Sequence, residues 1–164
     1  RDFCLSRGLG DVYKRQGCQL VASCDLAYAS SSAKFATPGV NIGLFCSTPM
    51  VAISRNLSNK HSMEMLLTGE LISSDKAAKI GLINDVIEIN KLKDFVLNKA
   101  SKISKKSSVT LKIGKEAFYK QLDMKLSDAY DYASKVMAQN MLKLDAKEGI
   151  DAFIDKREPI WKDK

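Results

Sequence analysis

The sequence has few of the residue types from which metal sites and nucleophilic sites are usually built. Its 164 residues include a single histidine, His61, which excludes histidine-rich metal sites and makes a serine–histidine arrangement a weak hypothesis. The four cysteines (Cys4, Cys18, Cys24 and Cys46) lack the spacing of a zinc site or a disulfide framework. We therefore expect no metal, no redox cofactor and reduced thiols, in the cytoplasm or, if the chain is eukaryotic, in the mitochondrial matrix.

Long apolar runs are also absent. No run approaches the roughly 18 residues of a membrane-spanning helix, so a spanning segment is not expected. The net charge of +7 comes from lysines dispersed over helical segments, with few arginines and no interleaved aromatic residues. A dispersed lysine surface is typical of solvation rather than of nucleic-acid recognition. An RNA-binding role, resting on this charge alone, stays a weaker alternative.

Regular patterning begins only at Gly17. Residues 1–16 show no helical or strand period, and we expect them to be a non-native leader, with a poorly ordered terminus as the alternative. Short strand and helix patterns alternate over 17–106, and only helical patterns follow over 107–164. The sequence therefore predicts an α/β core at 17–106 with a helical C-terminal extension.

Three short strands are expected in the core, at residues 25–29, 33–36 and 82–87. The second strand is closed by Pro38-Gly39, a dipeptide that predicts a type II turn with Gly39 at positive φ. A hydroxyl residue followed by Pro49 predicts the capped start of an apolar, buried helix that ends near residue 57.

The remaining pattern is helical. Gly69 is expected to cap one helix in the left-handed conformation, and Ser73 or Ser74 to begin the next, which stops at Gly81. The helix after Asn90 carries one apolar stripe: Leu92, Phe95, Val96, Ala100 and Ile103. Three more helices are expected at 109–122, 127–144 and 145–157, the last with a capping box formed by Asp145 and Glu148.

Four blocks of sequence resemble one family. GCQLVASCDLAYAS (17–30) and AKFATPGVNIGL (33–44) are similar to consecutive blocks of the crotonase superfamily, the enoyl-CoA hydratases and isomerases. LLTGELISSDKAAKIGLINDVI (66–87), the most specific match, and EGIDAFIDKREPIW (148–161) resemble two later blocks. The details GCQL, ATPGVNIGLFCSTP and FYKQL look most like one subgroup. The resemblance covers 17–161, but only the second half or more of a family member.

The resemblance implies a fold and a substrate. The fold is a crotonase-like (ClpP/crotonase) spiral of strand–strand–helix units, present here as its C-terminal part, followed by an α-helical trimerisation tail. The substrate is a coenzyme A thioester, and the full-length protein would be a homotrimer or a hexamer. Family members hold the thioester carbonyl between two backbone N–H groups, and Gly17 marks the region of one such donor.

Two departures bear on the reaction. Hydratases of the family use two glutamates, and the matching positions here hold Gln19 and Gly39. A glutamine amide cannot accept a proton at neutral pH, and glycine offers no side chain. The resemblance thus implies an acyl-CoA thioester-processing protein of the enoyl-CoA hydratase/isomerase family in which ordinary hydration is not expected. A non-catalytic acyl-CoA-binding or assembly subunit is the alternative.

Several residues keep two interpretations. Pro38, Phe45 and Ser47 would line the substrate pocket, although helix capping explains Ser47 and the adjacent Thr48 equally well. Lys156 would contact a coenzyme A phosphate from a neighbouring subunit, or be solvated. The other candidates have simpler structural explanations: Cys18 as a small buried residue, Asp25 as a cap or turn residue, and His61 as a solvated side chain.

Overall fold

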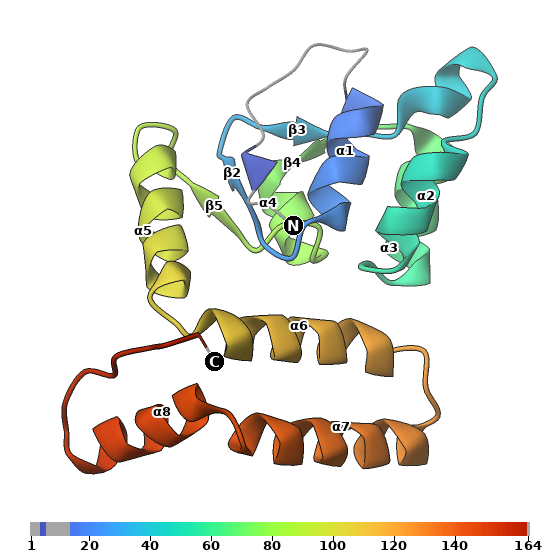
Figure 1. Ribbon diagram of the computed structural model, residues 1–164. Coiled ribbons are helices and arrows are strands. Elements are labelled where there is room, and N and C mark those ends of the chain that lie inside the picture. The colour runs from blue at the N-terminus through green and yellow to red at the C-terminus, as the bar shows by residue number, and fades with distance from the viewer. Residues whose placement is uncertain (1–3, 6–13, 164) are drawn as a thin grey trace. The chain divides into compact units, whose positions relative to one another are not determined.

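The computed structural model describes Cys4, Leu5 and residues 14–163, with side chains from Gly17 onward. The chain divides into two compact units, Arg1–Lys99 and Ala100–Lys164, and each is described by itself (Figure 1). The boundary expected at residue 106 stays a prediction. The same holds for the non-native leader, since most of residues 1–16 lie outside the described part of the chain.

A three-stranded parallel sheet forms the centre of the first unit, in the order β1-β2-β5. Its strands are β1 (Cys4–Leu5), β2 (Ala27–Ser30) and β5 (Asp85–Ile87). Every residue of β2 is buried, as expected of a central parallel strand that is covered on both faces. Asn84 holds the start of β2 in place, because its Oδ1 accepts the Ala27 N–H at 2.7 Å.

A second, antiparallel pair joins β3 (Lys34–Phe35) to β4 (Ile72–Ser73). The three strands predicted from the sequence are confirmed in position, although each is shorter than its apolar pattern. The sequence pattern does not predict β1 or β4, because two residues are too few to show the alternation of a strand.

Six helical segments accompany these strands in the described part of the first unit, and Figure 1 labels five of them, α1 to α5. They are α1 (Lys14–Ser23), the 3₁₀ helix η1 (Pro38–Ile42), α2 (Ser47–Ser54), α3 (Asn59–Thr68), α4 (Ser74–Lys79) and α5 (Leu92–Ser104), which runs into the second unit. The main core packs Cys18 and Val21 of α1 against Phe35 of β3, Ile53 of α2 and Met65 of α3. This core supports the α1 surface on which the candidate site lies.

Most of the predicted helix ends are confirmed. Gly69 ends α3 in the left-handed conformation, with φ of 62°, and its N–H donates to Met65 O. The Ser73 hydroxyl caps α4 by accepting the Lys76 N–H. The apolar stripe of α5 is also confirmed, since Leu92 and Val96 are buried. Short polar and glycine signals are therefore good guides to helix boundaries in this chain.

The predicted start of α2 is wrong. The helix begins at Ser47, with Cys46 in the N-cap position, and Pro49 is its third residue rather than its first. The Ser47 hydroxyl donates to the Phe45 carbonyl oxygen and caps no helical N–H. The helix is also less buried than expected: Pro49 and Ile53 are buried, whereas Val51 keeps 51% of its surface exposed.

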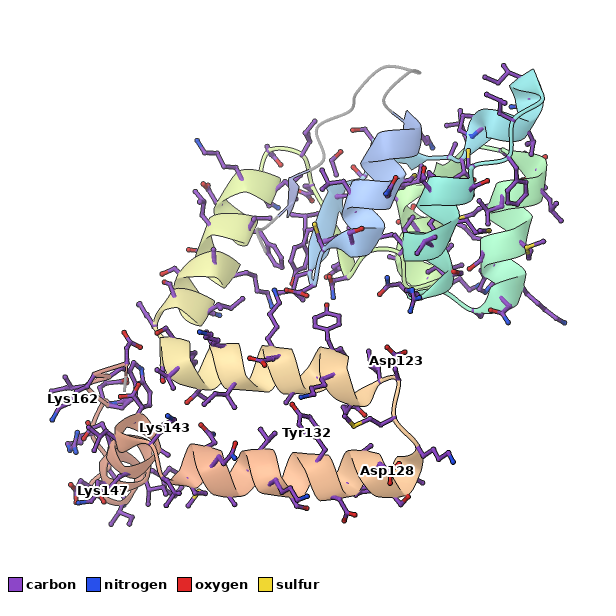
Figure 2. All side chains as sticks on the ribbon, turned by 45° about the vertical axis from the view of Figure 1, so that its right-hand side comes forward. Asp123, Asp128, Tyr132, Lys143, Lys147 and Lys162 are labelled. Atoms are coloured by element: carbon purple, nitrogen blue, oxygen red, sulfur yellow. The ribbon has the colours of Figure 1, made fainter. Side chains whose placement is uncertain are left out.

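The second unit contains three further helices and, within its described residues, no strand. They are α6 (Ser108–Gln121), α7 (Leu126–Met141) and α8 (Leu144–Ile154), and α6 and α7 lie side by side (Figure 1). Figure 2 shows Asp123 and Asp128 where α6 turns into α7, and Lys143, Lys147 and Lys162 around α8. Over the described residues, no helix is long and apolar enough to cross a membrane.

The predicted capping box of α8 is wrong, and its two acids hold the C-terminal segment instead. Asp145, only 2% exposed, accepts the Lys162 N–H at 2.8 Å and the Asp163 N–H at 3.1 Å. Glu148 accepts two hydrogen bonds from Arg157, at 2.6 and 3.1 Å, and one from the Ile160 N–H at 2.8 Å. The N-cap position belongs to Lys143. We call Asp145, Glu148 and residues 157–163 the C-terminal clamp.

Candidate functional site

The first half of the candidate site lies on α1. The helix begins at Lys14, so Gly17 is its fourth residue and the unpaired N–H groups of its first turn lie nearby. A Cβ on Gly17 would meet no atom within 4 Å. Packing among the described residues therefore does not require glycine there. Gln19 is half-buried, and its backbone carbonyl accepts the Ser23 hydroxyl at 2.8 Å.

The surroundings of Cys18 do not favour a reactive thiol. Its side chain is 2% exposed and belongs to the main core. Burial raises the pKa of the Cys18 thiol to about 11, against the smaller lowering effect of a hydrogen bond with the Ala36 backbone. Because α1 begins at Lys14, Cys18 also lies beyond the first turn, where a helix lowers thiol pKa values most. The prediction of a small buried residue is confirmed.

The second half of the site is the corner at Pro38-Gly39, and the predicted type II turn is wrong. These residues begin η1, and Gly39 does not have positive φ; Gly43, at the end of η1, does, with φ of 74°. Gly39 is needed for space instead. A Cβ on Gly39 would lie 2.4 Å from the Leu44 carbonyl oxygen and 2.7 Å from Cys46 Sγ. Position 39 is therefore closed to a side chain by its own loop.

The corner is fixed to the end of α3. The fully buried Thr37 donates its hydroxyl hydrogen bond to Met65 O at 2.8 Å. Gly69 packs so closely that a Cβ there would lie 2.9 Å from Val40 and 3.1 Å from the Pro38 Cα. These contacts hold Pro38 and Gly39 against a buried helix end, so the backbone of the corner has little freedom to move.

Two buried thiols connect the halves of the site. Cys18, adjacent to Gln19 in sequence, hydrogen-bonds the Ala36 backbone. Cys46 Sγ in turn accepts the Gly39 N–H at 3.3 Å. The structure thus packs α1 beside η1 and brings the segments of Gln19 and Gly39 together. Neither residue supplies a carboxylate, so neither can move a proton as a glutamate would.

The remaining candidates lie in three places. Phe45, 43% exposed, and the exposed Ser47 and Thr48 follow the Gly39 corner along the chain. Asp25 is an exposed residue between α1 and β2. Lys156 belongs to the second unit, where it is exposed and adopts φ of 54°. Pro38, Phe45 and Ser47 thus share the first unit with Gln19 and Gly39, whereas Lys156 belongs to the second.

His61 makes only local contacts near the start of α3 among those described. His61 lies half-buried on α3, with Nδ1 3.6 Å from Glu64 Oε2. Its backbone N–H donates to the capping hydroxyl of Ser58, as in an ordinary helix start. Among the residues whose placement is described, no three His, Cys, Asp or Glu side chains are grouped as a metal site requires.

Sequence reasoning missed Thr37 and Cys46 as residues that shape the site. Both are buried side chains that form hydrogen bonds, in a segment without helical or strand period. The residue type is the only available signal, and it does not identify the partner. Thr37 binds an atom 28 positions away, a contact that spacing along the chain does not predict.

Comparison with known proteins identifies the family of this chain. The sequence model of the enoyl-CoA hydratase/isomerase family matches residues 15–164, and the chain belongs to this family. The crystal structure of a Mycobacterium smegmatis enoyl-CoA hydratase superposes with a TM-score of 0.87 at 47% identity, over 90% of this chain and 57% of that one. The predicted crotonase superfamily and crotonase-like fold are confirmed.

More particular similarity is to enoyl-CoA hydratase domain-containing protein 3. The rat mitochondrial protein of that name is 51% identical over 145 residues, which cover 88% of this chain and 48% of the relative. The crystal structure of the human protein has a TM-score of 0.86 at 48% identity, over 88% of this chain and 57% of that one. The chain thus spans about half the length of these curated relatives. This is the subgroup that the GCQL and FYKQL details favour.

Proposed function

We propose that the full-length protein binds acyl-CoA thioesters and processes them without the two-glutamate hydration of its family. The observation that carries this proposal is the pair Gln19 and Gly39, at the two positions where hydratases of the family have glutamates. Gln19 offers an amide there, and Gly39 offers no side chain. Each missing acid–base group is worth about 10²–10⁴ in rate. No metal or redox cofactor enters the proposal, since the thioester is itself the substrate.

The residues of the site have distinct roles in this proposal. A backbone N–H in the first turn of α1, next to Gly17, stabilises the thioester oxygen, a contact whose loss typically costs roughly 2.7–4 kcal/mol. The Gln19 amide orients the thioester or a water molecule without accepting a proton. Pro38, Phe45 and Ser47 form the wall beside the acyl group, and Lys156 binds a phosphate of coenzyme A.

Assembly and location are part of the same proposal. Large apolar side chains of the second unit are exposed, among them Leu126, Tyr130, Leu142 and Phe153. Exposed apolar area of this extent is typical of a subunit interface. We propose a homotrimer or a hexamer for the full-length protein, which light scattering tests. The word mitochondrial in the relatives' names supports a matrix location.

The same absence of acids favours a second candidate, a non-catalytic acyl-CoA-binding or assembly subunit. A panel of acyl-CoA thioesters offered to the full-length protein separates the two. We expect micromolar binding by calorimetry together with a changed acyl product, seen by mass spectrometry, for at least one thioester. Binding without turnover across the panel selects the second candidate, and absence of binding contradicts both.

A further inference from the structure

Cys46 stands apart from the residues around it. From Asn41 to Thr48 it is the one buried side chain, with 4% of its surface exposed. The neighbouring Leu44 and Phe45 are apolar, yet they remain 57% and 43% exposed. A small thiol is therefore buried while larger apolar groups stay outside, which hydrophobicity alone does not explain.

The thiol makes a specific contact with the second acid/base position. Cys46 Sγ accepts the buried N–H of Gly39 at 3.3 Å. It also lies 2.7 Å from the place that a Cβ on residue 39 would occupy, where real side chains do not approach so closely. Cys46 therefore fills the volume into which any side chain on residue 39 would begin.

The same thiol closes the loop between η1 and α2. Gly43 turns the chain in the left-handed conformation, and the Leu44 N–H returns to the Gly39 carbonyl oxygen at 2.9 Å. This contact brings the Leu44 carbonyl oxygen to 2.4 Å from the Gly39 Cβ site. The loop residues themselves are exposed, so the loop is anchored against the corner by this backbone hydrogen bond and by the buried contact between Cys46 and Gly39.

We propose that Cys46 is a positioning residue that sets the shape of the substrate pocket at position 39. Its thiol holds loop 43–45 against Gly39. The pocket wall beside the acyl group is then formed by backbone and Phe45, and not by a side chain of residue 39. Residues 39 and 46 are then coupled: a side chain at 39 requires a smaller residue at 46. The role in substrate binding rests on the proposed function, whereas the coupling does not.

The coupling is tested by unfolding the full-length protein in urea. Gly39→Ala is expected to lower the folding equilibrium constant by about tenfold to a hundredfold, the usual effect of overpacking. In a Cys46→Gly background, which is tolerated at an N-cap, the same change should cost measurably less, because the contact with Cys46 Sγ is gone and that with the Leu44 carbonyl oxygen remains. Cys18→Gly is the matched control, because it removes a similarly buried thiol that is not among the atoms nearest the Gly39 Cβ site. If Gly39→Ala lowers the folding equilibrium constant equally in the wild type, in Cys46→Gly and in Cys18→Gly, the proposal is overturned.

The positioning role is tested by acyl-CoA affinity. Cys46→Ala should raise the Kd for crotonyl-CoA by about tenfold, because the freed loop no longer holds Phe45. Cys46→Ser, whose hydroxyl can also accept the Gly39 N–H, should restore most of the affinity, and Cys24→Ala, a change at a cysteine outside the candidate site, should leave it within twofold. An unchanged Kd in Cys46→Ala overturns the positioning role. If the wild type binds no acyl-CoA, the proposed function fails while the unfolding test of the coupling still stands.

Discussion

Gly39→Glu is expected to destabilise the full-length protein by at least about 3 kcal/mol, the upper part of the range for overpacking a filled site. The first atom of the new side chain would lie 2.4 Å from the Leu44 carbonyl oxygen and 2.7 Å from Cys46 Sγ. The nearer of these atoms belongs to the backbone, so it cannot rotate away as a side chain would. A buried carboxylate without a partner adds a desolvation cost. Urea unfolding followed by circular dichroism measures the effect.

Gly114→Ala is the matched control for this prediction. Gly114 lies on the exposed surface of α6, and a Cβ there would meet no atom within 4 Å. Alanine in a helix interior is favoured over glycine by about 0.5–1 kcal/mol, so the control should be slightly more stable than the wild type. If Gly39→Glu were also neutral or stabilising, the packing described for the corner would be incorrect.

The sequence predicts that position 39 requires glycine, but it attributes this requirement to positive φ and not to lack of space. A Pro-Gly pair favours a type II turn, and that pattern reports only the local preferences of two residues. The structure uses Gly39 because Leu44 and Cys46 return to it from further along the chain. A local pattern contains no information about that return, which depends on the left-handed Gly43 and on burial of the thiol.

Acidification is expected to release the C-terminal clamp. Hydrogen bonds from Arg157 lower the pKa of Glu148 from 4.5 to about 2, and the Ser107 hydroxyl with two backbone N–H groups lowers the pKa of Asp145. A lowered folded-state pKa stabilises the fold above the unfolded-state pKa, and this stabilisation is lost as the pH falls toward the folded value. The stabilisation should therefore be complete above about pH 5 and disappear toward pH 2.

Trp161 reports this release directly. It is the only tryptophan of the chain, and its indole N–H donates to the Lys105 carbonyl oxygen at 2.8 Å. Fluorescence should shift to the red between pH 5 and pH 2 as the clamp opens. In Glu148→Gln the clamp should be weaker at neutral pH, and the acid shift smaller. Glu158→Gln, a change at an exposed carboxyl in the same segment, should follow the wild-type titration. Identical titrations of all three proteins would contradict the clamp.

The C-terminal clamp depends on contacts that the sequence does not predict. Asp145 and Glu148 have the spacing of a capping box, and that spacing is equally compatible with contacts to a distant segment. Lys143 takes the N-cap position of α8, while both acids bind N–H groups or the guanidinium of residues 157–163. By contrast, Gly69 and Ser73 act within three or four residues of their partners, and both are predicted correctly. The caps of α3 and α4 are thus readable from local sequence, whereas the tertiary contacts of Asp145 and Glu148 are not.

The family and its fold were predictable because whole blocks of sequence carry them, whereas the wall of the site was not. The blocks that include GCQL and the region around Gly69 identify the enoyl-CoA hydratase/isomerase family, to which the matched residues assign the chain. The roles of Thr37 and Cys46 depend on contacts between η1, α2 and α3. Such contacts join segments whose order along the chain does not reveal their distance in space.

We infer that Gln19 and Gly39 leave the site without the acid and base of a hydratase. The most direct measurement is the hydration of crotonyl-CoA by the full-length wild type and by Gln19→Glu, at saturating substrate and after binding has been verified. We expect no hydration above the solvent rate by the wild type, and at most a small gain in Gln19→Glu, because paired catalytic groups act together. Substantial hydration by the wild type that Gln19→Glu leaves unchanged would contradict the claim and place the acid and base elsewhere.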